Sequence, residues 1–214
     1  MQAFTHHIGV AAPLLRDNID TDQIIPSREM KTVSKAGLGG GLFAGWRYQS
    51  PDTRMPDPDF VLNRPDYSGA SILLSGANFG CGSSREHAVW ALMDFGFCAI
   101  IAESFGEIFF NNCIMNGLLP ISLLRPKIEA LGAFVSEDPQ SHRLDIDLDA
   151  QTIVCAGDTI GFDIATGPKS RLLKGLDAIG ETLQHRDAIA KFLANDARKR
   201  PWAYAVSQLA KNES

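Results

Sequence analysis

The sequence has no long hydrophobic run, and this absence excludes a membrane-spanning helix. Its longest uninterrupted apolar stretches are six residues each, at 88–93 and 97–102, whereas a helix needs about 20 apolar residues to cross a bilayer. The first residues also lack the basic and apolar segments of a secretory signal peptide. We therefore expect no membrane partner and a cytoplasmic protein.

Basic residues are scarce as well. The chain has 20 Lys and Arg residues against 25 Asp and Glu residues, so its formal net charge is −5. A surface with this balance does not attract phosphate backbones. The one basic run, Arg198 to Arg200, stands at the end of a predicted helix, where positive charge suits the helix dipole. We predict no nucleic-acid partner.

Closely spaced metal ligands are missing too. The four cysteines are separated by 16, 14 and 41 residues and are Cys81, Cys98, Cys113 and Cys155. This spacing offers neither a zinc site nor an iron–sulfur site. We therefore predict that the chain itself holds no metal. Cys98 and Cys113 lie in apolar segments, and we expect both in the core as free thiols.

The length and composition predict one globular domain over residues 1–214. At roughly 150 residues per domain, a chain with 45% hydrophobic residues can form a single core of this size. Residues 27–68 are rich in glycine and proline, and we interpret them as an irregular, loop-rich insertion. An amphipathic period at 181–193 and a further helical segment predict a helical C-terminal tail at about 181–212.

The middle of the chain has the clearest pattern. Short apolar segments predict buried strands at 70–75, 97–102 and 118–124. Helical spacing predicts one helix that starts at Ser83 and ends at residue 95, and another over 105–116. The order β-α-β-α-β predicts an α/β fold with parallel strand pairs. Shorter strand candidates follow at 144–149, 152–155 and 159–164.

The turn before the first of these helices carries the polar residues of most interest. The segment Gly80-Cys-Gly-Ser-Ser-Arg85 resembles in part the G-x-G-x-x-G sequence of dinucleotide-binding proteins. Arg85, however, replaces the third glycine, which packs closely against the strand in that fold. The guanidinium group of Arg85 favours a carboxylate ligand at this turn. Dinucleotide binding is kept as the alternative function.

Two further interpretations of this turn come from local chemistry. Ser83 and Glu86 have the S-x-x-E spacing of a capping box, which would explain both residues without any catalytic function. Ser83 and His87 lie four residues apart and would be neighbours on a helix, as nucleophile and base of a serine hydrolase. Because the nucleophile-elbow pattern G-x-S-x-G is absent, we favour a structural role for His87.

Four segments of the chain resemble one known family. They are DNIDTDQIIP at 17–26, FVLNRPDY at 60–67, NFGCGSSREHA at 78–88 and NGLLP at 116–120. All are similar to segments of the small subunits of bacterial 3-isopropylmalate dehydratase, and the likeness runs over most of the chain. This resemblance implies an aconitase-type swivelling β/β/α domain with a mixed or parallel central sheet. It also implies a hydro-lyase of leucine biosynthesis that acts by dehydration and rehydration.

The resemblance also implies roles for individual residues. Ser83 matches the serine that acts as the base, and Arg85 matches the arginine that binds a substrate carboxylate. Ser84, Asp22 and Arg28 are expected to contribute to substrate binding. A 4Fe–4S cluster is expected on a separate large subunit and none on this chain, so the chain alone should be inactive. Removal of a proton beside a carboxylate builds negative charge there, which is why a base and a guanidinium must face one substrate.

One segment departs from the family pattern. After Ile-Ile-Pro, the dehydratases carry apolar residues thought to face the variable group of the substrate, whereas this chain has Ser27-Arg-Glu-Met-Lys31. Unpaired charge beside an isopropyl group would disfavour binding. The family resemblance implies 3-isopropylmalate as the substrate, whereas this charged segment keeps open, as the alternative, a related hydroxy diacid such as citramalate or dimethylmalate.

Overall fold

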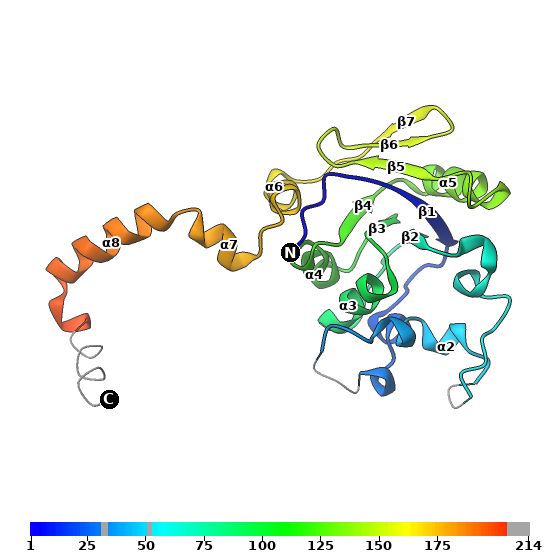
Figure 1. Ribbon diagram of the computed structural model, residues 1–214, viewed down its shortest axis with the longest axis horizontal. Coiled ribbons are helices and arrows are strands. Elements are labelled where there is room, and N and C mark those ends of the chain that lie inside the picture. The colour runs from blue at the N-terminus through cyan, green and yellow to red at the C-terminus, as the bar shows by residue number, and fades with distance from the viewer. Residues whose placement is uncertain (31–33, 51–52, 205–214) are drawn as a thin grey trace. The chain divides into compact units, whose positions relative to one another are not determined.

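The computed structural model describes residues 1–30, 34–50 and 53–204, which contain a seven-stranded sheet (Figure 1). The strand order is β4-β3-β2-β1-β5-β6-β7. Strands β1 to β4 pair in parallel, and β5 to β7 continue the sheet in antiparallel pairs. The strands are β1 (His6–Leu14), β2 (Ala70–Ser75), β3 (Ala99–Ala102), β4 (Leu119–Ser122), β5 (Leu144–Asp147), β6 (Thr152–Cys155) and β7 (Asp158–Gly161). The predicted α/β class with a mixed sheet is confirmed.

The helices of this sheet domain follow most of the predicted pattern. They are α1 (Thr21–Ile24), α2 (Ala44–Arg47), α3 (Glu86–Phe95), α4 (Glu107–Asn116), α5 (Arg125–Glu137) and α6 (Thr166–Lys174). The prediction that a helix starts at Ser83 was wrong, because α3 begins at Glu86. Helix α5 was not predicted. Proline is favoured in the first turn of a helix, and Pro126 lies there in α5.

The chain divides into two compact units, Met1–Gly175 and Leu176–Ser214. The second unit contains α7 (Ala178–Leu183) and α8 (Arg186–Lys199), so the amphipathic helix predicted at 181–193 is two helices. A short 3-10 turn follows at Pro201–Ala203. The end of the predicted tail lies outside the described residues, and the assignment of one domain with a helical tail stays a prediction.

The sheet is covered on both faces, and side chains that alternate along each strand supply the two cores. On one face, Leu73 packs in a cluster with Val89 and Leu92 of α3. On the other face, Ile72 packs with Leu131 of α5. Burial of one such side chain stabilises the fold by about 1.5–3 kcal/mol. These contacts hold α3 and α5 on opposite faces (Figure 1).

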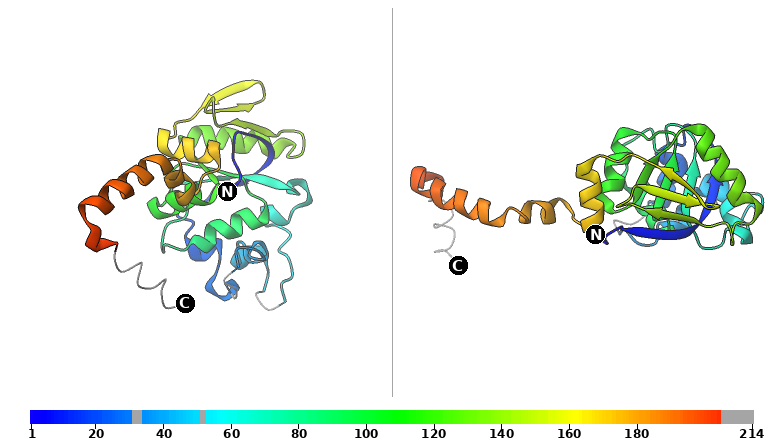
Figure 2. Two further views of the ribbon diagram at one scale, coloured as in Figure 1. Left: turned by 60° about the vertical axis from the view of Figure 1, so that its left-hand side comes forward. Right: turned by 90° about the horizontal axis from the view of Figure 1, so that it is seen from above.

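The antiparallel strands β5 to β7 form one end of the sheet, drawn in yellow-green and yellow in Figure 2. The other end consists of parallel strands joined by α3 and α4, as expected for right-handed β-α-β connections. Because β1 to β4 run in the same direction, their carboxyl ends meet at one edge of the sheet. Polar loops leave the strands at that edge, where open α/β sheets bind their ligands.

The described part of the insertion at 27–68 forms short helical turns, some of which pack on β1 and α3. These turns are Ser27–Glu29, Gly39–Gly41, Val61–Asn63 and Pro65–Tyr67, in addition to α2. Leu42 and Phe43 are fully buried in the cluster that contains the apolar side chains of α3. The Phe43 ring stacks on the Trp46 ring, with ring centroids 5.8 Å apart. The insertion therefore contributes to the core on the face of the sheet that carries the predicted site.

Candidate active site

The predicted site residues come from two loops that leave adjacent parallel strands. One loop follows β1 and leads into α1, and the other follows β2 and leads into α3. Backbone hydrogen bonds continue the β1–β2 pairing between them. They run from Gly76 N to Arg16 O (3.1 Å), Asn18 N to Ala77 O (2.8 Å), Gly80 N to Ile19 O (2.7 Å) and Thr21 N to Cys81 O (2.9 Å). The sheet register therefore places Asp22 opposite the Ser83 loop.

Asp22 and Arg85 form an ion pair across the two loops. Asp22 is held in the first turn of α1 by a capping box, in which Asp20 accepts the Gln23 amide at 2.7 Å. The Asp22 carboxylate also accepts the Ser27 hydroxyl at 3.3 Å. Arg85 is the N-cap of α3, and its side chain is 28% exposed. The ion pair thus orients the partly exposed guanidinium group of Arg85 between the two loops.

The Ser83 side chain is exposed and lies beside a buried threonine. Its Oγ atom is 3.0 Å from the Oγ1 atom of Thr21, which can also donate to the Ser83 carbonyl at 3.3 Å. Thr21 is 1% exposed, so an exposed serine hydroxyl contacts a buried threonine hydroxyl here. The sequence pattern did not identify Thr21, because nothing local links it to a residue 62 positions away.

The capping box predicted for Ser83 and Glu86 does not form. The N-cap of α3 is Arg85, with no side-chain cap. The Glu86 carboxylate instead accepts the Asn116 amide at 2.7 Å. The structural explanation of Ser83 was therefore wrong, and its hydroxyl remains available at the amino end of α3, where the first backbone amides have no partner within the helix.

The serine hydrolase alternative has no support in the geometry. The His87 ring contacts Trp90, with ring centroids 4.8 Å apart. Within the described part of the chain, no hydrogen bond joins His87 to Ser83. A structural role for His87 agrees with this contact.

Two glycines make the turn possible. Gly80 and Gly82 have φ of +72° and +95°, which favour glycine. A Cβ atom on Gly80 would overlap the ring of Phe109 in α4. The turn therefore lies tightly against α4 at Gly80, and this contact together with the positive φ of both residues explains the two glycines without a bound dinucleotide.

Two further predicted residues differ in their surroundings. Ser84 is exposed and follows Ser83 directly. Arg28 is also exposed, and its Nε atom is 3.6 Å from Glu29. Glu29 forms an ion pair with Arg54, and its side chain is only 11% exposed. The Glu29 carboxylate therefore pairs within the insertion, while no hydrogen bond or ion pair joins Arg28 to Asp22 or Arg85 among the described residues.

The thiols are not arranged as ligands. Cys113 is buried, as predicted, and burial raises its pKa well above the usual range. Cys98, also expected in the core, is partly buried and packs against the core cluster on the α5 face of the sheet. Burial and, less strongly, the charge of Asp20 raise the pKa of the Cys81 thiol. The described residues contain no group of three His, Cys, Asp or Glu side chains that could hold a metal ion.

Comparisons with known proteins agree on one family. A 3-isopropylmalate dehydratase small subunit from Cupriavidus necator is 54% identical over 205 residues, which cover 95% of this chain and 99% of that protein. One from Caulobacter vibrioides is 50% identical over 207 residues, covering 96% and 100%. The chain belongs to the family of 3-isopropylmalate dehydratase small subunits. It is therefore a hydro-lyase subunit rather than a dinucleotide-binding protein.

The family model and a solved structure agree with this assignment. Residues 1–126 match the model of the aconitase C-terminal domain. A crystal structure of 3-isopropylmalate dehydratase from Methanocaldococcus jannaschii superposes with a TM-score of 0.64 at 29% identity, covering 87% of this chain and 98% of that one. The aconitase-type fold implied by the sequence is confirmed. No helix in the described residues is long and apolar enough to cross a membrane.

Proposed function

We propose that this small subunit supplies the base and the carboxylate-binding arginine for the interconversion of 2-isopropylmalate and 3-isopropylmalate. Ser83 is the base and Arg85 the arginine in this proposal. The observation that carries it is that two adjacent residues of the β1 loop hold the two groups: Thr21 contacts the exposed Ser83 hydroxyl, and Asp22 forms an ion pair with Arg85. A separate large subunit completes the site.

The chemistry requires a proton acceptor and a fixed positive charge on one face of the substrate. In dehydration, Ser83 Oγ takes the proton from the carbon next to a carboxylate, the C–H electrons form the C=C bond, and the hydroxyl on the neighbouring carbon leaves as hydroxide with the C–O electrons. The proton on Ser83 and this hydroxide together are the water that is lost. Hydration of the other carbon reverses these steps and gives the isomer. Negative charge grows on the carboxylate as the C–H bond breaks, and Arg85 stabilises that charge.

Arg85 can serve Asp22 and a substrate together. A guanidinium carries five N–H donors in a planar fork, and the ion pair with Asp22 uses the Nη1 side. Such a partly exposed ion pair is worth roughly 0.2–1 kcal/mol, too little to be a major contribution to folding. We therefore assign it an orienting role, in which Asp22 turns the remaining donors toward the substrate carboxylate.

Thr21 can assist Ser83 through its single hydroxyl proton. While Ser83 is protonated, the Thr21 hydroxyl can donate to the Ser83 carbonyl and accept from Ser83 Oγ. When Ser83 is deprotonated, the Thr21 proton can turn to Oγ instead. Activation of a serine costs about 1.4 kcal/mol per pKa unit, and a helix amino end supplies at most about 2 kcal/mol. The isolated chain is therefore inactive in this proposal.

The cluster is proposed to belong to the large subunit. The donor set described above does not fit a 4Fe–4S cluster, since two of the four thiols are buried and no ligand group forms among the described residues. When bound, the cluster supplies a Lewis acid for the departing hydroxyl. The residues of this chain bind the carboxylate, orient it and move the proton at Ser83.

Ser84 and Arg28 are proposed as further substrate-binding groups. Ser84 is exposed next to Ser83. Arg28 keeps an exposed positive charge, because the ion pair of Glu29 with Arg54 leaves it only a 3.6 Å contact. This charge favours, as the second candidate, a diacid with a smaller or more polar variable group, such as citramalate. Comparing kcat/KM for the two substrates in wild type and Arg28→Met would decide between them.

The decisive experiment replaces Ser83 by alanine in the assembled two-subunit enzyme. Turnover should fall by about 10²–10⁴-fold, as for loss of a general base, with little change in KM. Loss of the Thr21 contact should cost about 0.5–1.5 kcal/mol of stability. Ser170→Ala in α6 is the control for an unrelated serine. Near-normal turnover of the Ser83→Ala enzyme would remove Ser83 from the mechanism.

A further inference from the structure

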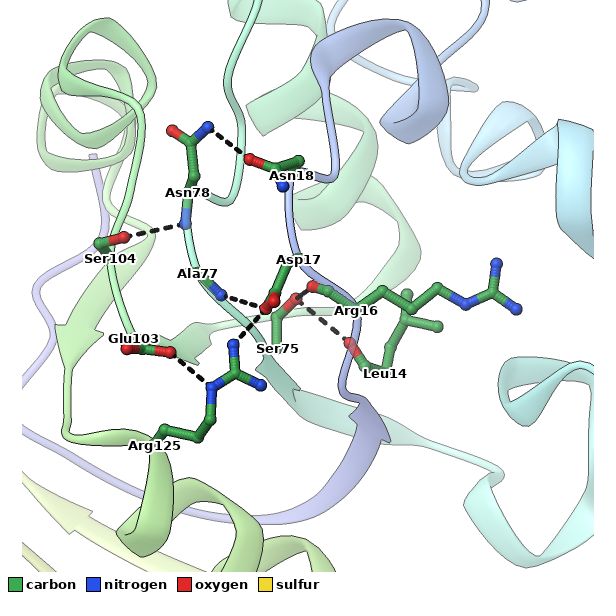
Figure 3. Close-up of polar contacts among 10 residues, drawn as sticks. All are labelled: Leu14, Arg16, Asp17, Asn18, Ser75, Ala77, Asn78, Glu103, Ser104 and Arg125. Atoms are coloured by element: carbon green, nitrogen blue, oxygen red, sulfur yellow. Dashed lines mark hydrogen bonds and ion pairs between the residues drawn. The ribbon is translucent and has the colours of Figure 1, made fainter.

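One arginine joins segments that follow three strands of the sheet (Figure 3). Asp17 follows β1, Glu103 follows β3, and Arg125 follows β4 as the first residue of α5. Arg125 forms an ion pair with Asp17 through Nη2, and its Nε atom donates to Glu103 at 2.8 Å. No short-range pattern predicts this group, because Arg125 and Asp17 are 108 positions apart.

The same carboxylates are tied to the loop that follows β2. The Asp17 oxygen that faces Arg125 also accepts the Ala77 amide at 2.8 Å. The Glu103 amide donates to the Gly76 carbonyl at 3.2 Å. The Ala77 amide first, and then Arg125, lower the pKa of the Asp17 carboxyl group, which keeps it charged. Through Asp17 and Glu103, Arg125 therefore holds the two segments that flank the start of the loop after β2.

An asparagine pair continues this connection toward the site. Asn18 and Asn78 both adopt left-handed backbone conformations, with φ of +55° and +57°. The Asn78 side-chain amide donates to Asn18 at 2.9 Å, and the Asn78 backbone amide donates to Ser104 at 2.9 Å. Such conformations cost energy in residues other than glycine and persist where the surroundings hold them.

The location of Arg125 argues against an ordinary helix-stabilising role. A cation at the amino end of a helix opposes the helix dipole, which favours acidic residues there. Arg125 is the first residue of α5, and no acidic residue lies in that first turn. Its side chain is 38% exposed, so burial does not explain it either. The two carboxylates are the contacts that account for an arginine at this position.

We propose that Arg125 is a positioning residue for the active site. By holding Asp17 and Glu103, it sets the register of the two loops that carry Asp22 on one side and Ser83 and Arg85 on the other. The hydrogen bonds between the loops transmit this register from Asp17 and Ala77 to Thr21 and Cys81. The effect on turnover rests on the proposed function, whereas the effect on the loops does not.

The test compares Arg125→Met, Arg125→Lys and Arg64→Met in the full chain. Arg64 forms an ion pair of similar exposure with Asp66 at 3.0 Å and is the matched control. Hydrogen exchange is measured first, on the isolated subunit. Arg125→Met should speed exchange of the Asn18, Ala77 and Gly80 amides several-fold, because local opening of these bonds becomes easier. Arg64→Met should leave these three amides unchanged.

Turnover is then measured with the large subunit. Small misplacements of catalytic groups can cost up to about 100-fold in rate, so Arg125→Met should lower kcat by roughly 10- to 100-fold. Arg125→Lys should recover part of the loss, since lysine keeps the charge without the planar fork. In the Asp22→Asn background, Arg125→Met should lower kcat by a smaller factor than in wild type. The reason is that Arg125 and Asp22 both act on the position of the same two loops.

Each outcome bears on the proposal. Unchanged exchange in Arg125→Met would overturn it, whatever the activity. Faster exchange with unaltered kcat would also overturn it, provided that Ser83→Ala is inactive. If Ser83→Ala is active as well, the proposed function fails, and faster exchange would still support control of the loop register by Arg125. Faster exchange together with a fall in kcat, and partial recovery in Arg125→Lys, would support the full proposal.

Discussion

Replacement of Gly80 by alanine should destabilise the protein more than any replacement that changes backbone strain alone. Gly80 has φ of +72°, and its added Cβ would overlap the Cγ atom of the buried Phe109 ring. The left-handed conformation costs an alanine roughly 1–2 kcal/mol. Overpacking of a close-packed core adds typically about 1–3 kcal/mol. The free energy of unfolding should therefore fall by about 2–5 kcal/mol.

Gly69→Ala provides a matched control for the strain. Gly69 has the same φ of +72°, but nothing lies within 4 Å of its added Cβ. The free energy of unfolding of the Gly69→Ala variant should fall by about 1–2 kcal/mol. For a chain of this size, about 1 kcal/mol shifts Tm by roughly 2–4 °C. We expect a fall in Tm of about 4–20 °C for Gly80→Ala and about 2–8 °C for Gly69→Ala.

A double-mutant cycle isolates the steric part of the effect. Calorimetry or circular dichroism gives Tm for each single variant, for Phe109→Leu and for the double variant Gly80→Ala/Phe109→Leu. Residues in contact show coupling energies of about 0.5–3 kcal/mol, and the smaller leucine should relieve part of the overlap. Equal losses for Gly80→Ala and Gly69→Ala, with additive effects of Phe109→Leu, would refute the packing argument.

Two predictions concern titratable groups. Burial, and then the charge of His6, lower the pKa of His7 below 6.5, and its Nε2 atom is 2.7 Å from the Ser71 hydroxyl. The unfolded chain therefore binds the proton more readily, so stability is lost as the pH falls below 6.5. Urea midpoints at pH 7 and pH 5 should differ less in His7→Gln than in wild type or in the exposed control His185→Gln. Iodoacetamide should label Cys81 well before the buried Cys113, whose raised pKa also suppresses the thiolate, and mass spectrometry that finds equal rates would contradict this.

Short-range patterns were sufficient for much of the fold. The strands β2, β3 and β4 and most of α3 and α4 follow from apolar runs and helical spacing, which depend on residues close together in the sequence. The predicted ends of several of these elements differ from the observed ones. Helix α3 begins three residues after Ser83, because Glu86 is bound by Asn116 from α4 instead of closing a local capping box.

The order of residues along the chain also shows which residue types gather in the central turn and which family they resemble. It identified Ser83, Arg85 and Asp22, but left Ser83 with a capping explanation that required no function. Only the tertiary structure paired Asp22 with Arg85 and placed the Thr21 hydroxyl beside Ser83.

The tertiary structure alone showed that Arg125 joins the ends of three strands. The reason is geometric. Parallel strands bring their carboxyl ends to one edge of the sheet whatever the length of chain between them, so contacts over 62 to 108 positions are set by strand order and register. Neither strand order nor register can be recognised in the local pattern of residues.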